Sequence, residues 1–256
     1  MRIQILCQVG AGLILPINYN HFLAAAIYRF LQMSDQDYAD FLHDQGYEAD
    51  QKRFKLFTFS QLTAQQRQLR GDQIHFLSQI SWQVSSPSQP FLQNLANSLM
   101  TQGHLQIDQQ RVRIQDVRVL PSPRYQSVMK FTCLSPLTIS TRREYQGQLS
   151  RHYCLPDDPQ LPALVQQNLS RKFQAIHGQL PSGDQFDLTF DPQYLQRRKG
   201  KVTKLIRYKN VDVRAILCPF TVAGSVELIQ VGYETGFGNN NSAGFGMARY
   251  VPPPST

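Results

Sequence analysis

The sequence predicts an α+β protein made of two ferredoxin-like domains in tandem, each with the element order β-α-β-β-α-β. Three observations support this fold class. Short runs of alternating apolar residues predict strands, segments with apolar residues at helical spacing lie between them, and a proline-rich break at residues 120–127 separates two copies of the order. We therefore expect domains at residues 1–122 and 123–256. With 256 residues, 41% of them apolar, the chain is long enough to bury two cores.

The first half supplies one copy of the order. Residues 2–9 alternate apolar and polar side chains, which predicts the first strand. A helix should follow, capped by Asn18 or Asn20, and a short helix should begin at Ser34. The copy is completed by two neighbouring strands at residues 54–60 and 73–84, a helix at 90–100, and a hairpin or long bent strand at 105–120.

The second half repeats the order without visible sequence similarity to the first. Its expected elements are strands at 128–133 and 137–141, a helix from Asp158 or Pro159 to about His177, an extended segment at 186–190, a hairpin at 201–220, a short helix within 221–231 and a last strand at 245–251. This second copy is the basis for predicting two domains of one type.

The charge balance favours a polyanionic partner such as nucleic acid. Lys and Arg number 26 against 18 Asp and Glu, a net charge of +8. Eight of these cations form a basic ribbon between residues 197 and 214: Arg197, Arg198, Lys199, Lys201, Lys204, Arg207, Lys209 and Arg214. Because side chains alternate across a strand, only part of the ribbon can face one ligand, and a solvated hairpin is the alternative interpretation.

Other function classes find no support in the sequence. The four cysteines, at positions 7, 133, 154 and 218, include no Cys-x-x-Cys pair, so we expect reduced thiols, mostly in the core, and no zinc site. Gln4 and Gln8 interrupt any apolar leader, and no run of eighteen apolar residues occurs, so we expect a cytoplasmic protein without membrane association.

A glycine-rich segment at residues 232–247 contains five of the fifteen glycines. Glycine is costly unless the backbone needs positive φ or a close approach, so this segment predicts a shaped loop. Ten residues after Gly246 are too few for a dinucleotide-binding βαβ unit, and no Gly-Lys-Ser/Thr triplet is present for a P-loop. Such a loop can still hold phosphates through its backbone amides, or serve only as a structural turn.

The glycine-rich segment, read as Gly-x-Gly, a spacer and Gly-Phe-Gly, resembles that of the CRISPR-associated endoribonucleases of the RAMP superfamily. Residues 15–20, 55–60 and 134–139 share the resemblance, which thus spans nearly the whole chain. It implies tandem ferredoxin-like domains and metal-independent, cofactor-free cleavage of CRISPR repeat RNA. The 2′-hydroxyl of the RNA would attack the adjacent phosphate, giving 2′,3′-cyclic phosphate and 5′-hydroxyl ends.

The resemblance also implies a catalytic triad of tyrosine, histidine and lysine. The matching residues are Tyr28 in the first helix, His43 at the end of the next helix, and Lys55 entering the second strand, with Lys52 as the alternative lysine. Histidine can transfer protons as acid or base, lysine can stabilise charge on phosphoryl oxygens, and a tyrosine hydroxyl can orient the nucleophile. Without the resemblance, Tyr28 would be interpreted as a packing residue and Lys55 as a strand-edge lysine.

The expected partner is therefore precursor CRISPR RNA, bound by a monomer or homodimer, with other effector subunits as further candidates. The residues expected to bind RNA are Lys52, Arg53, the ribbon cations Arg197, Arg198, Lys199, Lys201, Lys204, Arg207 and Lys209, and the loop glycines Gly236, Gly238, Gly244 and Gly246. Two alternatives remain open at this point. One is a non-catalytic subunit that binds repeat RNA in an effector complex, and the other is a generic RRM-like protein, although no RNP motif is evident.

Overall fold

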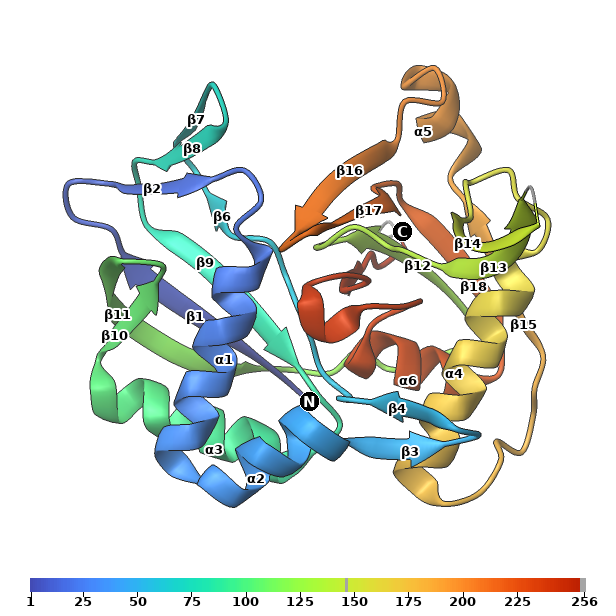
Figure 1. Ribbon diagram of the computed structural model, residues 1–256, viewed down its shortest axis with the longest axis horizontal. Coiled ribbons are helices and arrows are strands. Elements are labelled where there is room, and N and C mark those ends of the chain that lie inside the picture. The colour runs from blue at the N-terminus through green and yellow to red at the C-terminus, as the bar shows by residue number, and fades with distance from the viewer. Residues whose placement is uncertain (146, 254–256) are drawn as a thin grey trace.

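The computed structural model describes residues 1–145 and 147–253. Two sheets, each with helices on one face, lie side by side (Figure 1). The N-terminal half, blue to green, forms one of these units, and the C-terminal half, yellow-green to red, forms the other. Their buried cores are separate, one running from Ile3 to Val112 and the other from Met129 to Ala248.

The N-terminal sheet has the strand order β10-β11-β1-β9-β5, with β6 also paired to β9. Its strands are β1 (Arg2–Gln8), β5 (Thr58–Phe59), β6 (Thr63–Ala64), β9 (Ile80–Ser85), β10 (His104–Ile107) and β11 (Gln110–Leu120). Helices α1 (Asn20–Ser34) and α3 (Gln89–Gln102) pack against each other on one face. The central strand β1 is antiparallel to both neighbours, so Ile5 lies opposite Val117 and Trp82.

The C-terminal sheet has the order β15-β18-β12-β19. Its elements are β12 (Val128–Cys133), α4 (Leu161–His177), β15 (Phe186–Phe190), β18 (Phe220–Gly224), α6 (Val226–Thr235) and β19 (Ala248–Tyr250). The prediction of two tandem ferredoxin-like domains is confirmed. The boundary at residues 122 and 123 stays a prediction, and it falls in a segment without regular secondary structure.

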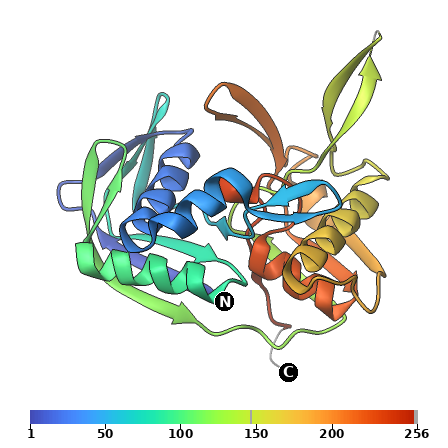
Figure 2. The same cartoon turned by 60° about the horizontal axis from the view of Figure 1, so that its bottom comes forward.

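Short hairpins and helices lie outside the two main sheets. They are β2 (Leu13–Pro16), β7 (Arg67–Arg70) and β8 (Gln73–Phe76), the pairs β3 (Tyr47–Ala49) with β4 (Lys52–Phe54), β13 (Ser140–Tyr145) with β14 (Gln148–Tyr153) and β16 (Thr203–Tyr208) with β17 (Val211–Ile216), and helices α2 (Gln36–Asp40) and α5 (Pro192–Arg197). Figure 2 shows β13–β14, in yellow-green, and β16–β17, in orange-brown, projecting from the body on the same side.

Several predicted boundaries are wrong. The expected strand at residues 54–60 is broken at Leu56, which has a φ of +52°, so that Phe54 ends β4 and Thr58–Phe59 form β5. Residues 73–84 divide into β8 and β9, and β8 pairs with β2 and β7 instead of the main sheet. The expected strand at 137–141 begins only at Ser140. Of the cysteines, three are buried and one is partly buried, and all four are free thiols.

The helix caps also differ from the prediction. Tyr19 holds the cap position of α1, without a side-chain cap, and Asp35 instead of Ser34 caps α2 by accepting a hydrogen bond from the Tyr38 amide. Asn20 is buried and points to the other domain, where its amide donates to the carbonyls of Ala243 and Gly244 at 3.2 and 3.1 Å. Among the described residues, no helix is both long and apolar enough to cross a membrane.

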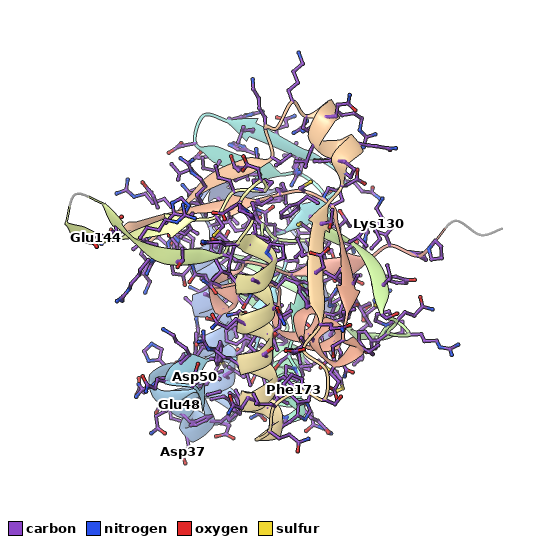
Figure 3. All side chains as sticks on the ribbon, turned by 90° about the vertical axis from the view of Figure 1, so that its right-hand side faces the viewer. Asp37, Glu48, Asp50, Lys130, Glu144 and Phe173 are labelled. Atoms are coloured by element: carbon purple, nitrogen blue, oxygen red, sulfur yellow. The ribbon has the colours of Figure 1, made fainter. Side chains whose placement is uncertain are left out.

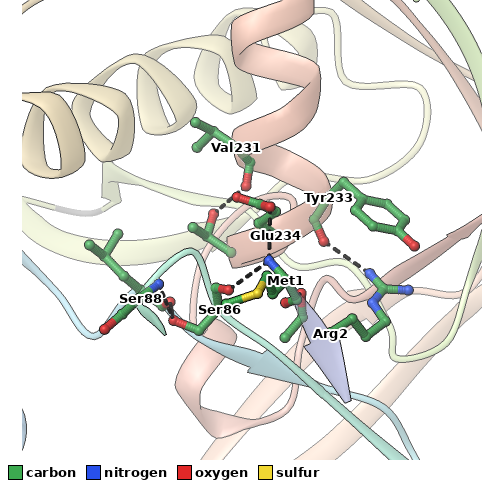
Figure 4. Close-up of polar contacts among 10 residues, drawn as sticks. Met1, Arg2, Ser86, Ser88, Val231, Tyr233 and Glu234 are labelled. Atoms are coloured by element: carbon green, nitrogen blue, oxygen red, sulfur yellow. Dashed lines mark hydrogen bonds and ion pairs between the residues drawn. The ribbon is translucent and has the colours of Figure 1, made fainter. Parts of the chain in front are cut away.

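The two domains are joined by buried polar contacts from β1. The guanidinium of Arg2 donates to the carbonyls of Tyr233 and Ala248 at 2.9 and 3.0 Å and lies 3.9 Å from the Tyr233 ring centroid. Beside it, the Met1 amino group lies 2.9 Å from the Glu234 carboxylate (Figure 4). The two carbonyls satisfy part of the buried guanidinium, and these contacts fix the start of β1 against α6 and β19.

The glycine-rich loop forms the second part of the domain interface. The Thr58 hydroxyl donates to the Phe245 carbonyl at 3.0 Å, and a Cβ at Gly244, whose φ is +83°, would overlap the ring of Phe59. The loop backbone therefore approaches β5 more closely than any side chain allows.

We expect Gly244→Ala to lower the free energy of unfolding by about 3 kcal/mol, because it adds both backbone strain and overpacking at the interface. Gly178→Ala is the matched control, since Gly178 has a φ of +71° and a Cβ added there would meet no atom within 4 Å. The control should lose only about 1 kcal/mol. Urea titrations measure both, and equal losses would contradict the close packing of the loop.

Candidate active site and basic cleft

The predicted catalytic histidine lies on a π-helical turn at the end of α2. This turn, Phe41–Gln45, ends when the Gly46 amide donates to the Phe41 carbonyl at 2.7 Å. π-Helical turns are rare in proteins, and those that occur are often found at functional sites. The turn leaves the side chain of His43 70% exposed, with its Nδ1 atom 2.7 Å from Oδ1 of Asp44.

Tyr28 reaches the same place from α1. Its ring stands edge-on to the His43 ring, with centroids 5.5 Å apart, and edge-on to the ring of Phe57 at 6.0 Å. Burial, aided by nearby Tyr208, raises the pKa of the Tyr28 hydroxyl above its usual value. At neutral pH this hydroxyl is therefore neutral, able to donate or accept a hydrogen bond.

Lys55 completes the cluster from the segment between β4 and β5. Its ammonium donates a hydrogen bond to the main-chain carbonyl of His43. Burial lowers the pKa of Lys55, and the carboxylate of Asp44 opposes this shift. Lys52, the alternative lysine, is exposed on β4. The structure thus brings Tyr28, His43 and Lys55 together, and the lysine in contact with His43 is Lys55.

A basic cleft of about 1330 Å³ begins beside this cluster. Its walls come from residues 52–57, helix α4, the β13–β14 hairpin and the glycine-rich loop. Seven lining residues are basic: Lys52, Arg53, Lys55, Arg142, Arg151, Arg171 and Lys172. No Asp or Glu belongs to the described lining. Like charges gathered in a concave site focus a positive potential, which favours a polyanion.

An ion pair holds the β3–β4 hairpin against the second domain. The guanidinium of Arg171 on α4 lies 2.7 Å from the carboxylate of Asp50 at the hairpin turn. Figure 3 shows Glu48 and Asp50 beside α4. With Asp50 58% exposed, the pair contributes little stability, but it sets the position of the segment that carries Lys52 and Arg53.

The predicted RNA-binding glycines lie under the surface of the cleft. Gly236, Gly238, Gly244 and Gly246 are all buried. The loop surface that lines the cleft comes from Asn239, Asn240, Asn241 and Ser242. Direct contact between these glycines and RNA stays a prediction. In the structure, the glycines allow the loop to pack closely between the two domains.

The basic ribbon lies apart from the candidate active site. Its members occupy the end of α5, the following turn and the β16–β17 hairpin, and all of those predicted to bind RNA are exposed. None belongs to the described lining of the cleft, which the hairpin reaches only through Val211. The hairpin also contacts the N-terminal domain, where the Arg207 amide donates to the Asn18 side chain at 3.1 Å.

Among the described residues, no three His, Cys, Asp or Glu side chains form a group that could hold a metal ion. The side chains that meet at this site are those of Tyr28, His43 and Lys55, with Asp44 beside the histidine ring.

Comparison with known proteins identifies the family of this chain. A family model described as "CRISPR associated protein Cas6, C-terminal" matches residues 120–250, and one described as "CRISPR-associated protein Cas6, N-terminal" matches residues 14–118. The chain belongs to the CRISPR-associated Cas6 family. It is 30% identical to the CRISPR-associated endoribonuclease Cas6 1 of Methanocaldococcus jannaschii, over 96% of this chain and 91% of that protein. It is 26% identical to a putative CRISPR-associated endoribonuclease-like protein Cas6 of Pyrococcus furiosus, over 98% of this chain and 99% of that protein.

Solved structures share the fold. A structure titled "CRISPR associated protein Cas6" has a TM-score of 0.79 at 29% identity and covers 98% of this chain and 99% of its own. A Cas6-related protein from Pyrococcus furiosus has a TM-score of 0.84 at 23% identity, with 98% of both chains covered.

No sequence motif singles out four of the basic cleft residues, or Asp44, in this Cas6 family member. Arg142 and Arg151 are scattered in sequence but face each other in the register of β13 and β14. Arg171 and Lys172 look like ordinary helix residues. A signal for Lys172 was present, because it lies on the same helical stripe as Val165 and Leu169, where an apolar residue is expected.

We expect Tyr28→Ala to lower the free energy of unfolding by about 2 to 3 kcal/mol, because it empties the contact with Phe57 and His43. Tyr28→Phe should change it by less than about 0.5 kcal/mol, because it keeps the ring. Chemical denaturation measures both. A large loss in Tyr28→Phe would show that the hydroxyl has a structural task.

Proposed function

We propose that this Cas6 family member is an endoribonuclease that cleaves CRISPR repeat RNA and so produces guide RNAs. One observation carries the proposal: Tyr28 and His43 meet beside Lys55, and Lys55 lines a cleft whose charged lining is entirely basic among the described residues. The relatives named as Cas6 endoribonucleases support it.

In the proposed reaction the chain's own side chains carry every step. The 2′-hydroxyl of the RNA loses its proton, a bond forms between O2′ and phosphorus, the bond from phosphorus to O5′ breaks, and O5′ gains a proton. The products are a 2′,3′-cyclic phosphate and a 5′-hydroxyl. No metal ion is needed, because both proton transfers and the stabilisation of the phosphoryl oxygens can come from side chains.

His43 is the proton-transfer residue in this proposal. The carboxylate of Asp44, at 2.7 Å from Nδ1, holds that nitrogen protonated, so Nε2 is directed away from Asp44 and is available for the reaction. The Lys55 ammonium lies next to the turn that carries His43 and supplies positive charge to the phosphoryl oxygens. The neutral Tyr28 hydroxyl orients the attacking 2′-hydroxyl.

The RNA is held by its phosphates along the cleft. Arg142 and Arg151 on one wall and Lys52 and Arg53 on the other can contact the backbone of a single strand. Such contacts carry no sequence information, so recognition of the repeat comes from its shape or its unpaired bases.

His43→Ala should reduce the cleavage rate by about a hundredfold or more while leaving the affinity for RNA within about twofold, because it removes proton transfer and no phosphate contact. The cleavage rate is measured with cognate repeat RNA in EDTA, and the product ends are identified. The affinity for RNA is measured by filter binding. His104→Ala, at an exposed site on β10, is the matched control and should cut normally. A wild-type protein that binds the repeat tightly and never cuts it is a binding subunit, and the proposed enzyme is then rejected.

The path of the RNA can be tested with paired double variants. Arg142→Gln with Arg151→Gln should weaken binding by about tenfold or more and reduce the slope of log affinity against log salt by about 0.7 for each lost phosphate contact. Arg197→Gln with Arg198→Gln removes the same charge from the exposed ribbon, where screening is stronger, and should weaken binding less. A larger loss in the ribbon variant would place the RNA outside the cleft.

A further inference from the structure

Lys172 is a buried cation that the proposed reaction does not use. It lies on α4 with 2% of its surface exposed and forms part of the lining of the cleft. Its ammonium donates to the carbonyls of Gly236 and Gly238 at 2.7 and 3.0 Å and to Oδ1 of Asn241 at 2.7 Å. All three acceptors belong to the glycine-rich loop, so this one side chain holds three positions of the loop, at residues 236, 238 and 241.

All three acceptors are neutral. Among the described residues, no carboxylate lies within ion-pairing distance, 4.0 Å, of the Lys172 ammonium. Across the cleft and on α4 the charged lining residues are Lys52, Arg53, Lys55, Arg142, Arg151 and Arg171. The acids on the elements packed against α4 are engaged elsewhere: Glu234 with Met1, Glu227 with Ser182, Asp187 with Thr189, Glu48 near Arg53 and Asp50 with Arg171. Burial without a counter-charge lowers the pKa of Lys172 to about 7.

The loop needs the charged form of this lysine. An ammonium has three hydrogens to donate, and all three acceptors lie within hydrogen-bonding distance. A neutral amine has two, so loss of the proton leaves one buried loop acceptor without its donor. An unsatisfied buried acceptor is costly, and the loop must then shift.

We propose that Lys172 is a positioning residue that couples the shape of the glycine-rich loop to RNA in the cleft, so that RNA binds with uptake of a proton at this lysine. This inference rests on the proposed function, because it requires RNA phosphates in the cleft. A polyanion there favours the ammonium form, the ammonium holds the loop in the shape described, and the loop presents Asn239, Asn240 and Ser242 to the RNA.

The sign of the pH dependence follows from linkage. If RNA raises the pKa of Lys172 from about 7, protons and RNA promote each other's binding, so affinity falls as pH rises from about 7 to 9. A rise of about 1 to 1.5 pH units corresponds to a five- to tenfold loss of affinity over this range. Lys55 is the other cleft group whose pKa is lowered, by burial.

The test compares RNA affinity at pH 7 and pH 9 in proteins that all carry His43→Ala, so that the RNA stays intact. The probes are cognate repeat RNA and oligouridylate. We expect the parent protein to lose about five- to tenfold in affinity over this range and Lys172→Met to lose less than about twofold. Lys55→Met and Arg171→Gln are matched controls, which remove a neighbouring cation and should keep most of the pH dependence.

Calorimetry on the parent protein tests the same inference without altering Lys172. Binding enthalpies at pH 8 in buffers of different ionisation enthalpy should show uptake of a sizeable fraction of a proton for each RNA bound. Tight binding without proton uptake, or the same pH dependence in Lys172→Met as in its parent, overturns the role of Lys172 and leaves the proposed function standing. Absence of RNA binding at pH 7 overturns the proposed function itself.

Discussion

The seating of the glycine-rich loop between the two sheets is the contact on which the rest of the site depends. The loop is held from the N-terminal domain by Asn20 and Thr58, whose side chains donate to its carbonyls, and from the C-terminal domain by Lys172. Because Thr58 begins β5, three residues after Lys55, this seating also fixes the segment that carries Lys55 relative to the cleft. The loop therefore affects the candidate active site without touching it, by setting the backbone position of the segment that carries Lys55.

The cleft brings together basic side chains whose positive charges repel one another. Its basic side chains converge from both domains, with Asp50 pairing only Arg171 at the rim. Like charges in a concave site repel each other, and the apolar cores and the buried contacts of Arg2 offset that repulsion. Such a concentration of positive charge favours binding of a polyanion, because a polyanion neutralises several cations at once and so removes the repulsion between them.

The periodic elements of the fold could be predicted from the sequence, whereas the site required long-range information. Strand β1 and helix α3 lie close to their predicted places because apolar periodicity is a local signal. The positive φ of Leu56, which breaks the expected aromatic strand, is imposed by tertiary packing that no local pattern reveals. The local pattern around Asn20 indicates a helix cap. Its true hydrogen-bond partners cannot be seen in that pattern, because they lie more than 220 residues away in the sequence. The meeting of Tyr28, His43 and Lys55 was expected only from a family resemblance.

The two halves of the chain divide the proposed task. Tyr28, His43 and Lys55 come from the N-terminal half, while Arg142, Arg151, Arg171 and Lys172, four of the seven cleft cations, come from the C-terminal half. His43 is largely exposed, so it can act only on a strand that other residues hold in place. In the proposed function the cleft holds the strand, and its lining comes from both domains, which the loop joins. The site is therefore a property of the interface, which explains why its glycines are buried under the surface that RNA would touch.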